Sequence, residues 1–127
     1  MGWTDIKTRM DDNVLAFNSE IKRLSSDLIA TADESWSEIQ LQTVKIIYEA
    51  TERMLAVGDA TPDGDREHWL HDLRSPGASM LSAVTLLLDE VDYSPSTLNT
   101  AVVSVLQEKI VRLRAAVDEM TGEHEEW

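Results

Sequence analysis

The sequence predicts an all-α protein, built from two antiparallel helical hairpins that form a four-helix bundle. Apolar residues recur every three or four positions, which is the period of a helix with one buried face. Glycine and proline are few, at five and three of 127 residues. They mark two of the breaks between helices, one around Gly58–Gly64 and one at Ser94–Pro95. No stretch shows the alternation with a period of two that is typical of a strand.

The first helix is predicted over residues 3–31 and the second over residues 35–57. Ser35 and Glu38 have the spacing of a capping box at the start of the second helix, and Gly58 suits the position just after its end. Both helices carry one apolar stripe. The stripe residues are Trp3, Ile6, Met10, Val14, Phe17, Ile21, Leu24 and Leu28 in the first helix, and Ile39, Ile46, Ile47, Ala50, Met54 and Val57 in the second.

The third helix is predicted over residues 65–92 and the fourth over residues 95–121. Ser94 resembles an N-cap that is followed by Pro95 at the first helical position. The stripe residues are Leu70, Leu73, Met80, Leu81, Val84, Leu87, Leu88 and Val91 in the third helix, and Leu98, Val102, Val105, Leu106, Ile110, Leu113, Val117 and Met120 in the fourth.

Short connections between long helices make neighbours antiparallel. We therefore expect an N-terminal hairpin over residues 1–60, a second hairpin over residues 61–121, and an acidic tail over residues 122–127. Each apolar stripe must be buried against another stripe. The two hairpins can pair within one chain, or each can pair with its copy in a second chain, and the sequence leaves both arrangements open.

Composition excludes several classes of function. The chain has no cysteine, which rules out a disulfide scaffold and a thiolate metal site. Its net charge of −13 makes nucleic acid and anionic membranes poor partners. We expect a cytoplasmic protein, because the N-terminus lacks the apolar core of a signal peptide and no apolar run approaches the length of a membrane span. No glycine-rich phosphate loop is present, so we expect no ATP site. His68 and His71 are spaced like a metal pair, but without a convincing third ligand we expect no metal.

One short stretch in the third predicted helix differs from the rest of the chain, and it reads His71-Asp72-Leu73-Arg74-Ser75-Pro76. It resembles the H-box of the dimerisation and histidine-phosphotransfer domain of histidine kinases, the HisKA type. That box has a histidine, an acidic residue, leucine, a basic residue, a small hydroxyl or amide residue, and proline, and all six positions match. The box of the family also lies in the first helix of an antiparallel hairpin. The resemblance covers about residues 65–121 and does not reach the first 60 residues.

The resemblance implies a role for each polar residue of this stretch. His71 is the expected phosphoryl acceptor, because a neutral imidazole is a good nucleophile near pH 7. It follows Leu70 by one position, about 100° around the helix, so we expect it to point outward beside the buried stripe. Asp72 is expected to orient the ring and take up its proton, as a general base. Arg74 is expected to offset the charge of the phosphate.

The stretch departs from the family pattern in two places. Gly77 stands where the family usually has a large apolar residue, so we expect the local packing to differ from that of the family. Ser75 stands where members with strong phosphatase activity usually carry threonine or asparagine. A hydroxyl is present there, and the resemblance links a polar side chain at this position to dephosphorylation of a partner. We also expect Pro76 to kink the helix just after the box.

The resemblance implies a two-component signalling protein in which phosphate passes between His71 and an aspartate of a response-regulator receiver domain. The chain lacks the ATP-binding domain of a complete kinase, so it is either a kinase fragment or a separate phosphotransfer protein. No cofactor is expected on this chain, and Mg²⁺ is expected on the partner receiver. The alternative is a non-catalytic helical adaptor, or a degenerate kinase-like dimerisation module, that binds a signalling partner. We expect a homodimer, since the hairpins of the family pair across a two-fold axis.

Overall fold

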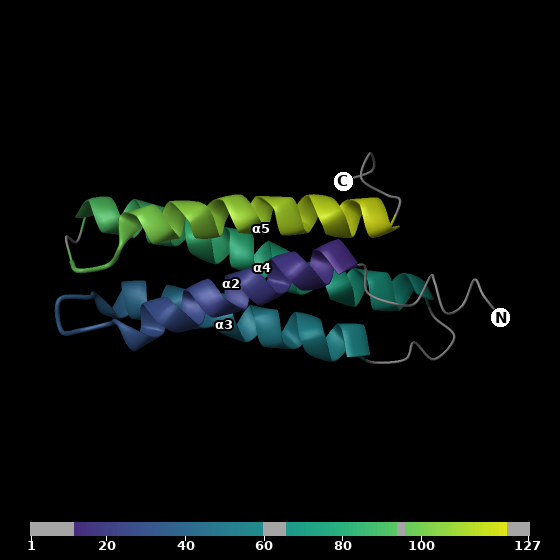
Figure 1. Cartoon of the computed structure of the whole chain (residues 1–127), viewed down its shortest axis with the longest axis horizontal. Coiled ribbons are helices and arrows are strands. Elements are labelled where there is room, and N and C mark those ends of the chain that lie inside the picture. The colour runs from purple at the N-terminus through teal and green to yellow at the C-terminus, as the bar shows by residue number, and fades with distance from the viewer. Residues whose placement is uncertain (1–11, 60–65, 94–95, 122–127) are drawn as a thin grey trace.

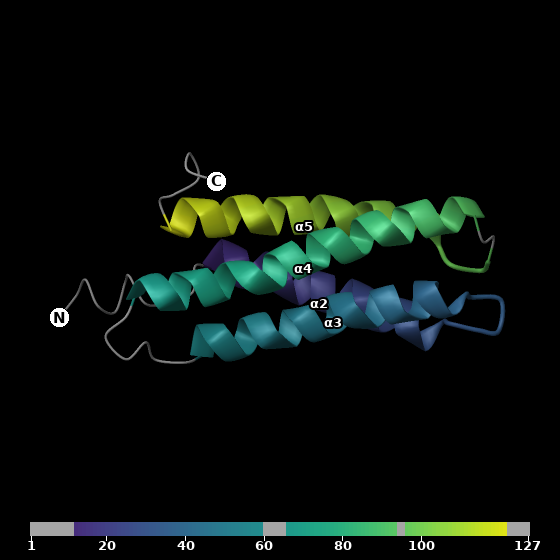
Figure 2. The ribbon, with the colours of Figure 1, turned by 180° about the vertical axis from the view of Figure 1, so that it is seen from behind.

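The structure is a computed structural model, and it describes residues 12–59, 66–93 and 96–121. Within these ranges all regular structure is helical and there is no strand. The helices are α2 (Asp12–Ala30), α3 (Glu38–Asp59), α4 (Arg66–Tyr93) and α5 (Thr100–Thr121). Figures 1 and 2 show them lying along one common axis, each antiparallel to the one before it. The all-α four-helix prediction is confirmed, whereas the predicted start of the first helix at residue 3 lies outside the described residues.

The four helices close into a ring within a single chain. Helix α2 packs on α3 and α5, and helix α4 also packs on α3 and α5, so α2 and α4 lie diagonally across the bundle. The chain thereby buries both hairpins against each other. Of the two arrangements that the sequence leaves open, this is the one in which one chain completes the bundle.

The core consists of one continuous apolar face from each helix. Val14, Ile21 and Leu28 of α2 recur every seven residues and are buried, which is the seam spacing of helices that pack nearly parallel to one another. Burying an aliphatic side chain of this size contributes roughly 1.5–3 kcal/mol. The other predicted stripe residues that are buried are Ile47, Ala50, Met54, Leu73, Met80, Val84, Leu87, Leu98, Leu106, Ile110, Leu113 and Val117.

Three residues that the stripes predict as buried are exposed, namely Ile39, Ile46 and Val105. In α3 the buried face passes through Gln40 and Ile47 instead, each one position further along the helix. A shift of one residue turns a side chain by about 100°, enough to move it from the core to the surface. The stripes therefore locate the helices correctly but place these side chains on the wrong side of the boundary of the buried face.

The capping box of α3 lies two residues later than predicted. The backbone N–H of Gln40 donates to Oγ of Ser37 at 3.1 Å, and the N–H of Ser37 donates to Oε1 of Gln40 at 2.9 Å. This reciprocal pair satisfies two N–H groups that the first turn of a helix leaves without partners. The same contact explains why the polar Gln40 is fully buried. The predicted pair Ser35 and Glu38 does not form the box.

Helix α5 begins five residues later than predicted, at Thr100. Its cap is Asn99, whose Oδ1 accepts hydrogen bonds from the N–H groups of Ala101 at 3.1 Å and Val102 at 3.3 Å. Asparagine is among the strongest N-cap residues. The predicted start of α5 at residue 95 is therefore wrong, and the predicted cap Ser94 lies outside the described residues.

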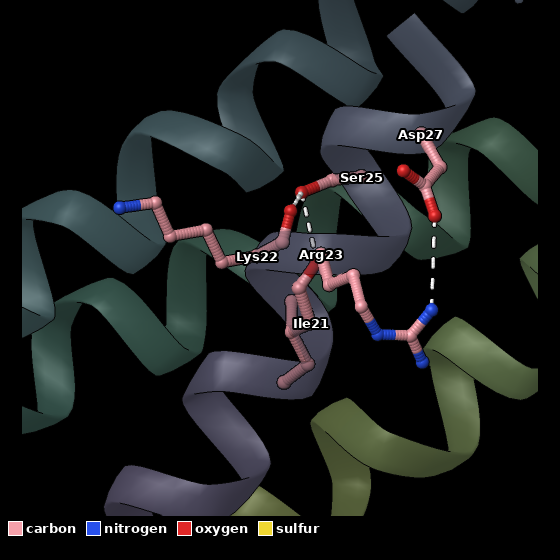
Figure 3. Close-up of polar contacts among 5 residues, drawn as sticks. All are labelled: Ile21, Lys22, Arg23, Ser25 and Asp27. Atoms are coloured by element: carbon pink, nitrogen blue, oxygen red, sulfur yellow. Dashed lines mark hydrogen bonds and ion pairs between the residues drawn. The ribbon is translucent and has the colours of Figure 1, made fainter. Parts of the chain in front are cut away.

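A few polar side chains lie inside the bundle. Nδ2 of Asn18 donates to the backbone oxygen of Thr51 at 3.1 Å, joining α2 to α3, while its Oδ1 is buried without a hydrogen bond from any described residue. Oγ of Ser25 donates back to the backbone oxygen of Ile21 at 2.8 Å, as Figure 3 shows. Ser25 therefore satisfies its hydroxyl within its own helix.

The two hairpins are pinned together at one end of the bundle, where the α2–α3 connection meets the segment before α5. Oδ2 of Asp33 accepts a hydrogen bond from the hydroxyl of Thr97 at 2.8 Å, and Oγ of Ser35 accepts one from the N–H of Thr97 at 2.9 Å. The indole N–H of Trp36 donates to the same Thr97 hydroxyl at 3.2 Å. We call these four residues the end clamp. Further along the bundle, Nζ of Lys109 lies 3.0 Å from Oε2 of Glu20 and links α5 to α2.

Among the described helices, none combines the length and apolar character that crossing a bilayer requires.

Candidate functional site

The stretch His71–Pro76 lies in the first half of α4, near the end of the bundle where α2 begins and α5 finishes (Figures 1 and 2). Helix α4 runs without a break from Arg66 to Tyr93, and Pro76 lies inside it. The helix continues through the proline, and the kink expected there stays a prediction. The stretch therefore stands on a regular element that neighbouring helices hold in place.

His71 is strongly exposed, with 77% of its side chain accessible. Leu73, two positions later, is fully buried in the core. Residues two positions apart point about 200° away from each other around the helix axis. Because Leu73 points into the core, His71 points toward solvent. The outward position expected from the sequence agrees with this exposure. A partner molecule has open access to the imidazole.

Asp72 lies next to the imidazole. Its Oδ1 is 3.7 Å from Nδ1 of His71, and the Asp72 side chain is about half exposed. This separation is longer than a hydrogen bond but within the range of an ion pair with a protonated ring. The carboxylate therefore lies on the Nδ1 side of the ring.

Arg74 and Ser75 are three and four positions after His71, so both lie on its side of the helix, one turn further along. Arg74 is half-buried toward α5, where it lines a small cavity of about 10 Å³ with Gly77 and Arg114. Ser75 is exposed and faces α3. The two side chains thus flank the His71 face of α4 from opposite sides.

The side chain of Arg114 explains why glycine, and not a large apolar residue, fits at position 77. A Cβ atom on Gly77 would lie 3.6 Å from Cγ of Arg114, so the stem of Arg114 occupies the space beside it. A large apolar side chain there would have to displace Arg114. Sequence reasoning did not single out Arg114, and no local signal marks it, because the contact depends on how α5 aligns with α4.

A groove between α3 and α4 begins at Ser75. It is open to solvent, has a volume of about 480 Å³, and continues along α4 as far as Leu86. Thr43 and Ile46 line it from α3. Sequence reasoning assigned Ile46 to the core and gave no role to Thr43. The exposure of Ile46 becomes visible only once the buried face of α3 is known.

Among the residues that the structure describes, no three histidine, aspartate or glutamate side chains gather closely enough to hold a metal ion. The side chain of His68 lies outside the described part, so its spacing to His71 stays a sequence observation. The site offers an accessible imidazole with a carboxylate on its Nδ1 side. A guanidinium and a hydroxyl lie one turn further along α4.

Comparison of the chain with known protein families, with curated proteins and with solved structures finds no match.

Proposed function

We propose that this chain is a histidine phosphotransfer protein, in which His71 exchanges a phosphoryl group with the aspartate of a response-regulator receiver domain. The observation that carries the proposal is the exposed imidazole of His71 within a six-residue stretch that matches the H-box position by position. Exposure matters because the phosphoryl group has to be delivered by another protein. A buried histidine would exclude this chemistry.

The transfer forms one bond to phosphorus and breaks another. A ring nitrogen of His71 attacks the phosphorus of the receiver's aspartyl phosphate, an N–P bond forms, the O–P bond breaks, and the receiver's carboxylate leaves. Asp72 lies toward Nδ1, which makes Nε2 the attacking nitrogen. The ring keeps its proton on Nδ1 and becomes positively charged as the bond forms. The Asp72 carboxylate stabilises that charge and can take up the proton.

Arg74 and Ser75 would act around the transferred group. A guanidinium one turn from the nucleophile offsets negative charge as the phosphoryl group approaches. The Ser75 hydroxyl can hold a water molecule or a phosphate oxygen by a hydrogen bond. Mg²⁺ would be held by the receiver, and this chain would bind no cofactor. Both proteins would meet in the cytoplasm.

The test is incubation of the purified chain with a phosphorylated receiver and Mg²⁺. We expect phosphate on His71 that is labile in acid and stable in base. His71→Gln should abolish the transfer and leave the helix content unchanged, because an exposed helix side chain alters stability by less than about 0.5 kcal/mol. His68→Gln and His124→Gln, the other two histidines of the chain, are the matched controls and should retain it.

The competing adaptor function predicts a different pattern. An adaptor would bind its partner equally well with glutamine at position 71, and its binding would be lost on substitution of Arg74. If His71→Gln keeps full biological activity while Arg74→Ala abolishes partner binding, phosphotransfer is wrong and the chain acts by binding alone. Asp72→Asn separates the two further, because it should slow transfer by on the order of 10²-fold or more without changing partner affinity.

A further inference from the structure

The groove between α3 and α4 carries no charged side chain in its lining. Its residues are Thr43, Ile46, Ser75, Ala78, Ser79, Ser82, Ala83 and Leu86. This is unusual for a chain in which 28% of residues are charged and the net charge is −13. Elsewhere on such a surface, two copies approaching each other would bring carboxylates together. The lining of the groove adds no carboxylate to that repulsion, which is left to residues at its rim.

We propose that this groove is the surface on which a second copy of the chain docks. Because α2, α3, α4 and α5 already complete a bundle within one chain, a shared-bundle dimer has no vacant place to fill. A dimer must therefore use an outer face. The exposed apolar side chains Ile46 and Leu86, 42% and 48% accessible, both line this groove and would be covered there.

The face of α4 in the groove is complementary to itself. Ser75 and Leu86 are eleven residues apart, which is just over three full turns, so they share one face about 16 Å apart. Between them this face carries only small side chains, Ala78, Ser79 and Ser82. The face is therefore shallow along most of its length and ends in one large protruding side chain.

Two copies of α4 that pack antiparallel across a two-fold axis would be complementary in shape. With the axis between residues 80 and 81, Leu86 of each copy faces Ser75 of the other, and Ser79 faces Ser82. The protruding leucine then fills the shallow end of the opposite groove, and small residues let the two helices approach closely in the middle. His71 lies one turn beyond Ser75, outside the groove lining, so this pairing leaves the imidazole at its edge.

The rim of the pairing makes it sensitive to salt. Asp89 lies one turn beyond Leu86, and in this register it comes opposite Asp72 of the second copy. Together with the net charge of each chain, this opposes association at low salt. Because salt shortens the Debye length from about 10 Å at 0.1 M to about 3 Å at 1 M, the dimer should tighten as salt increases. An interface held by opposite charges would weaken instead.

The experiment measures the mass of the whole chain in solution by light scattering or sedimentation, across protein concentration, at about 0.1 M and 1 M KCl. We expect a species of twice 14.3 kDa that dissociates on dilution and dissociates less readily at high salt. Leu86→Lys should raise the dissociation constant on the order of 100-fold, since it places a charge in each apolar contact. Ser79→Arg, a second variant, should do the same by filling the centre of the interface.

The matched control is Val111→Lys, which changes the charge of the chain by the same amount at an exposed apolar residue of α5, 52% accessible and away from the groove. It should dimerise at least as tightly as the unmodified chain. A mass of 14.3 kDa at both salt concentrations overturns the proposal and leaves the groove to a different protein. A dimer that survives both Leu86→Lys and Ser79→Arg overturns it as well. The mass measurements do not involve His71, so their failure leaves the phosphotransfer proposal standing. The two proposals share Ser75, which the second copy would cover.

Discussion

At the scale of single residues, Asp33 shows how one exposed side chain contributes to joining the two hairpins. Its pKa is lowered below the ordinary value of 3.8, first by the hydrogen bond from the Ser35 hydroxyl, then by the one from the Thr97 hydroxyl, and then by the N–H of Ser35. These donors at 2.6–2.8 Å all favour the charged carboxylate. Ser35 belongs to the connection after α2 and Thr97 to the segment before α5, so the carboxylate joins parts of the chain far apart in sequence.

The lowered pKa of Asp33 makes the end clamp dependent on pH. The unfolded chain takes up the proton near 3.8 and the folded chain only at lower pH, so the stabilisation is fully present above 3.8. It is lost as the pH falls through the lower folded pKa. We expect Asp33→Asn to reduce stability at pH 7, and the difference from the unmodified chain to shrink on acidification below 3.8.

Urea unfolding at a series of pH values measures this difference for Asp33→Asn. The exposed neighbour Glu34 provides the control, because Glu34→Gln removes the same charge beside the clamp and should change stability far less. A constant difference between the Asp33→Asn and unmodified chains down to pH 2 would contradict the assignment of the clamp to the charged carboxylate.

Gly77 illustrates a position at which a neighbour on another helix limits the size of the side chain. It lies inside α4, where glycine costs roughly 1 kcal/mol relative to alanine. An added Cβ would make an ordinary contact with Arg114 at 3.6 Å. We therefore expect Gly77→Ala to raise the free energy of unfolding by about 0.5–1 kcal/mol, measured by urea or thermal unfolding. Gly77→Leu should destabilise the chain, because it must displace Arg114; a gain in stability with leucine would disprove the close approach.

At the scale of the helices, N-terminal caps mark where α3 and α5 begin. Asn99 caps α5 through two backbone N–H groups, and Asn99→Ala leaves both without their partner. We expect a loss of about 1 kcal/mol in the free energy of unfolding, whereas Asn99→Ser should retain most of the stability. Chemical unfolding of the two variants beside Ser104→Ala, an exposed position within α5, measures it. Equal effects at positions 99 and 104 would show that Asn99 is not the cap.

The caps also show why boundaries are harder to predict than helices. Residues 35–40 contain two capping-box spacings, Ser35 with Glu38 and Ser37 with Gln40, and both obey the same local rule. The structure uses the second, because Ser35 is engaged by Asp33 and Thr97 in the end clamp. The choice between two equally good local signals was made by a contact 62 residues away in the sequence.

At the scale of the whole molecule, the ring of contacts makes each hairpin depend on the other. Helix α3 packs on α4 and α2 packs on α5, so separating the chain after residue 60 would expose the core face of both halves. We expect an equimolar mixture of fragments 1–60 and 61–127 to show more helix by circular dichroism than the sum of the separate spectra. Ile47→Asp in the first fragment, which places a charge in the core, should abolish the gain. Additive spectra from the unmodified fragments would show that the hairpins fold independently.

Much of the candidate site was visible in the sequence, because its signal is local. The order of His71, Asp72, Arg74 and Ser75 along a helix fixes which of them share a face, and burial of Leu73 turns His71 outward. The residues that surround the site on other helices could not be predicted from the sequence. Arg114 beside Gly77 and the α3 residues Thr43 and Ile46 beside Ser75 come from other helices, and their approach depends on how the helices align.

The sequence by itself determined the helical class, the number of long helices and the residues that form most of the core. The physical reason is that helix period, chain breaks and apolar spacing act over a few residues and do not need the rest of the molecule. Only the tertiary structure decided that one chain closes the bundle, which capping signal is used, and which side of α3 is buried. These depend on contacts between segments far apart in the chain. Whether Ile46 is core or surface is settled by how α3 turns against α2 and α4, and no stretch of α3 alone contains that information.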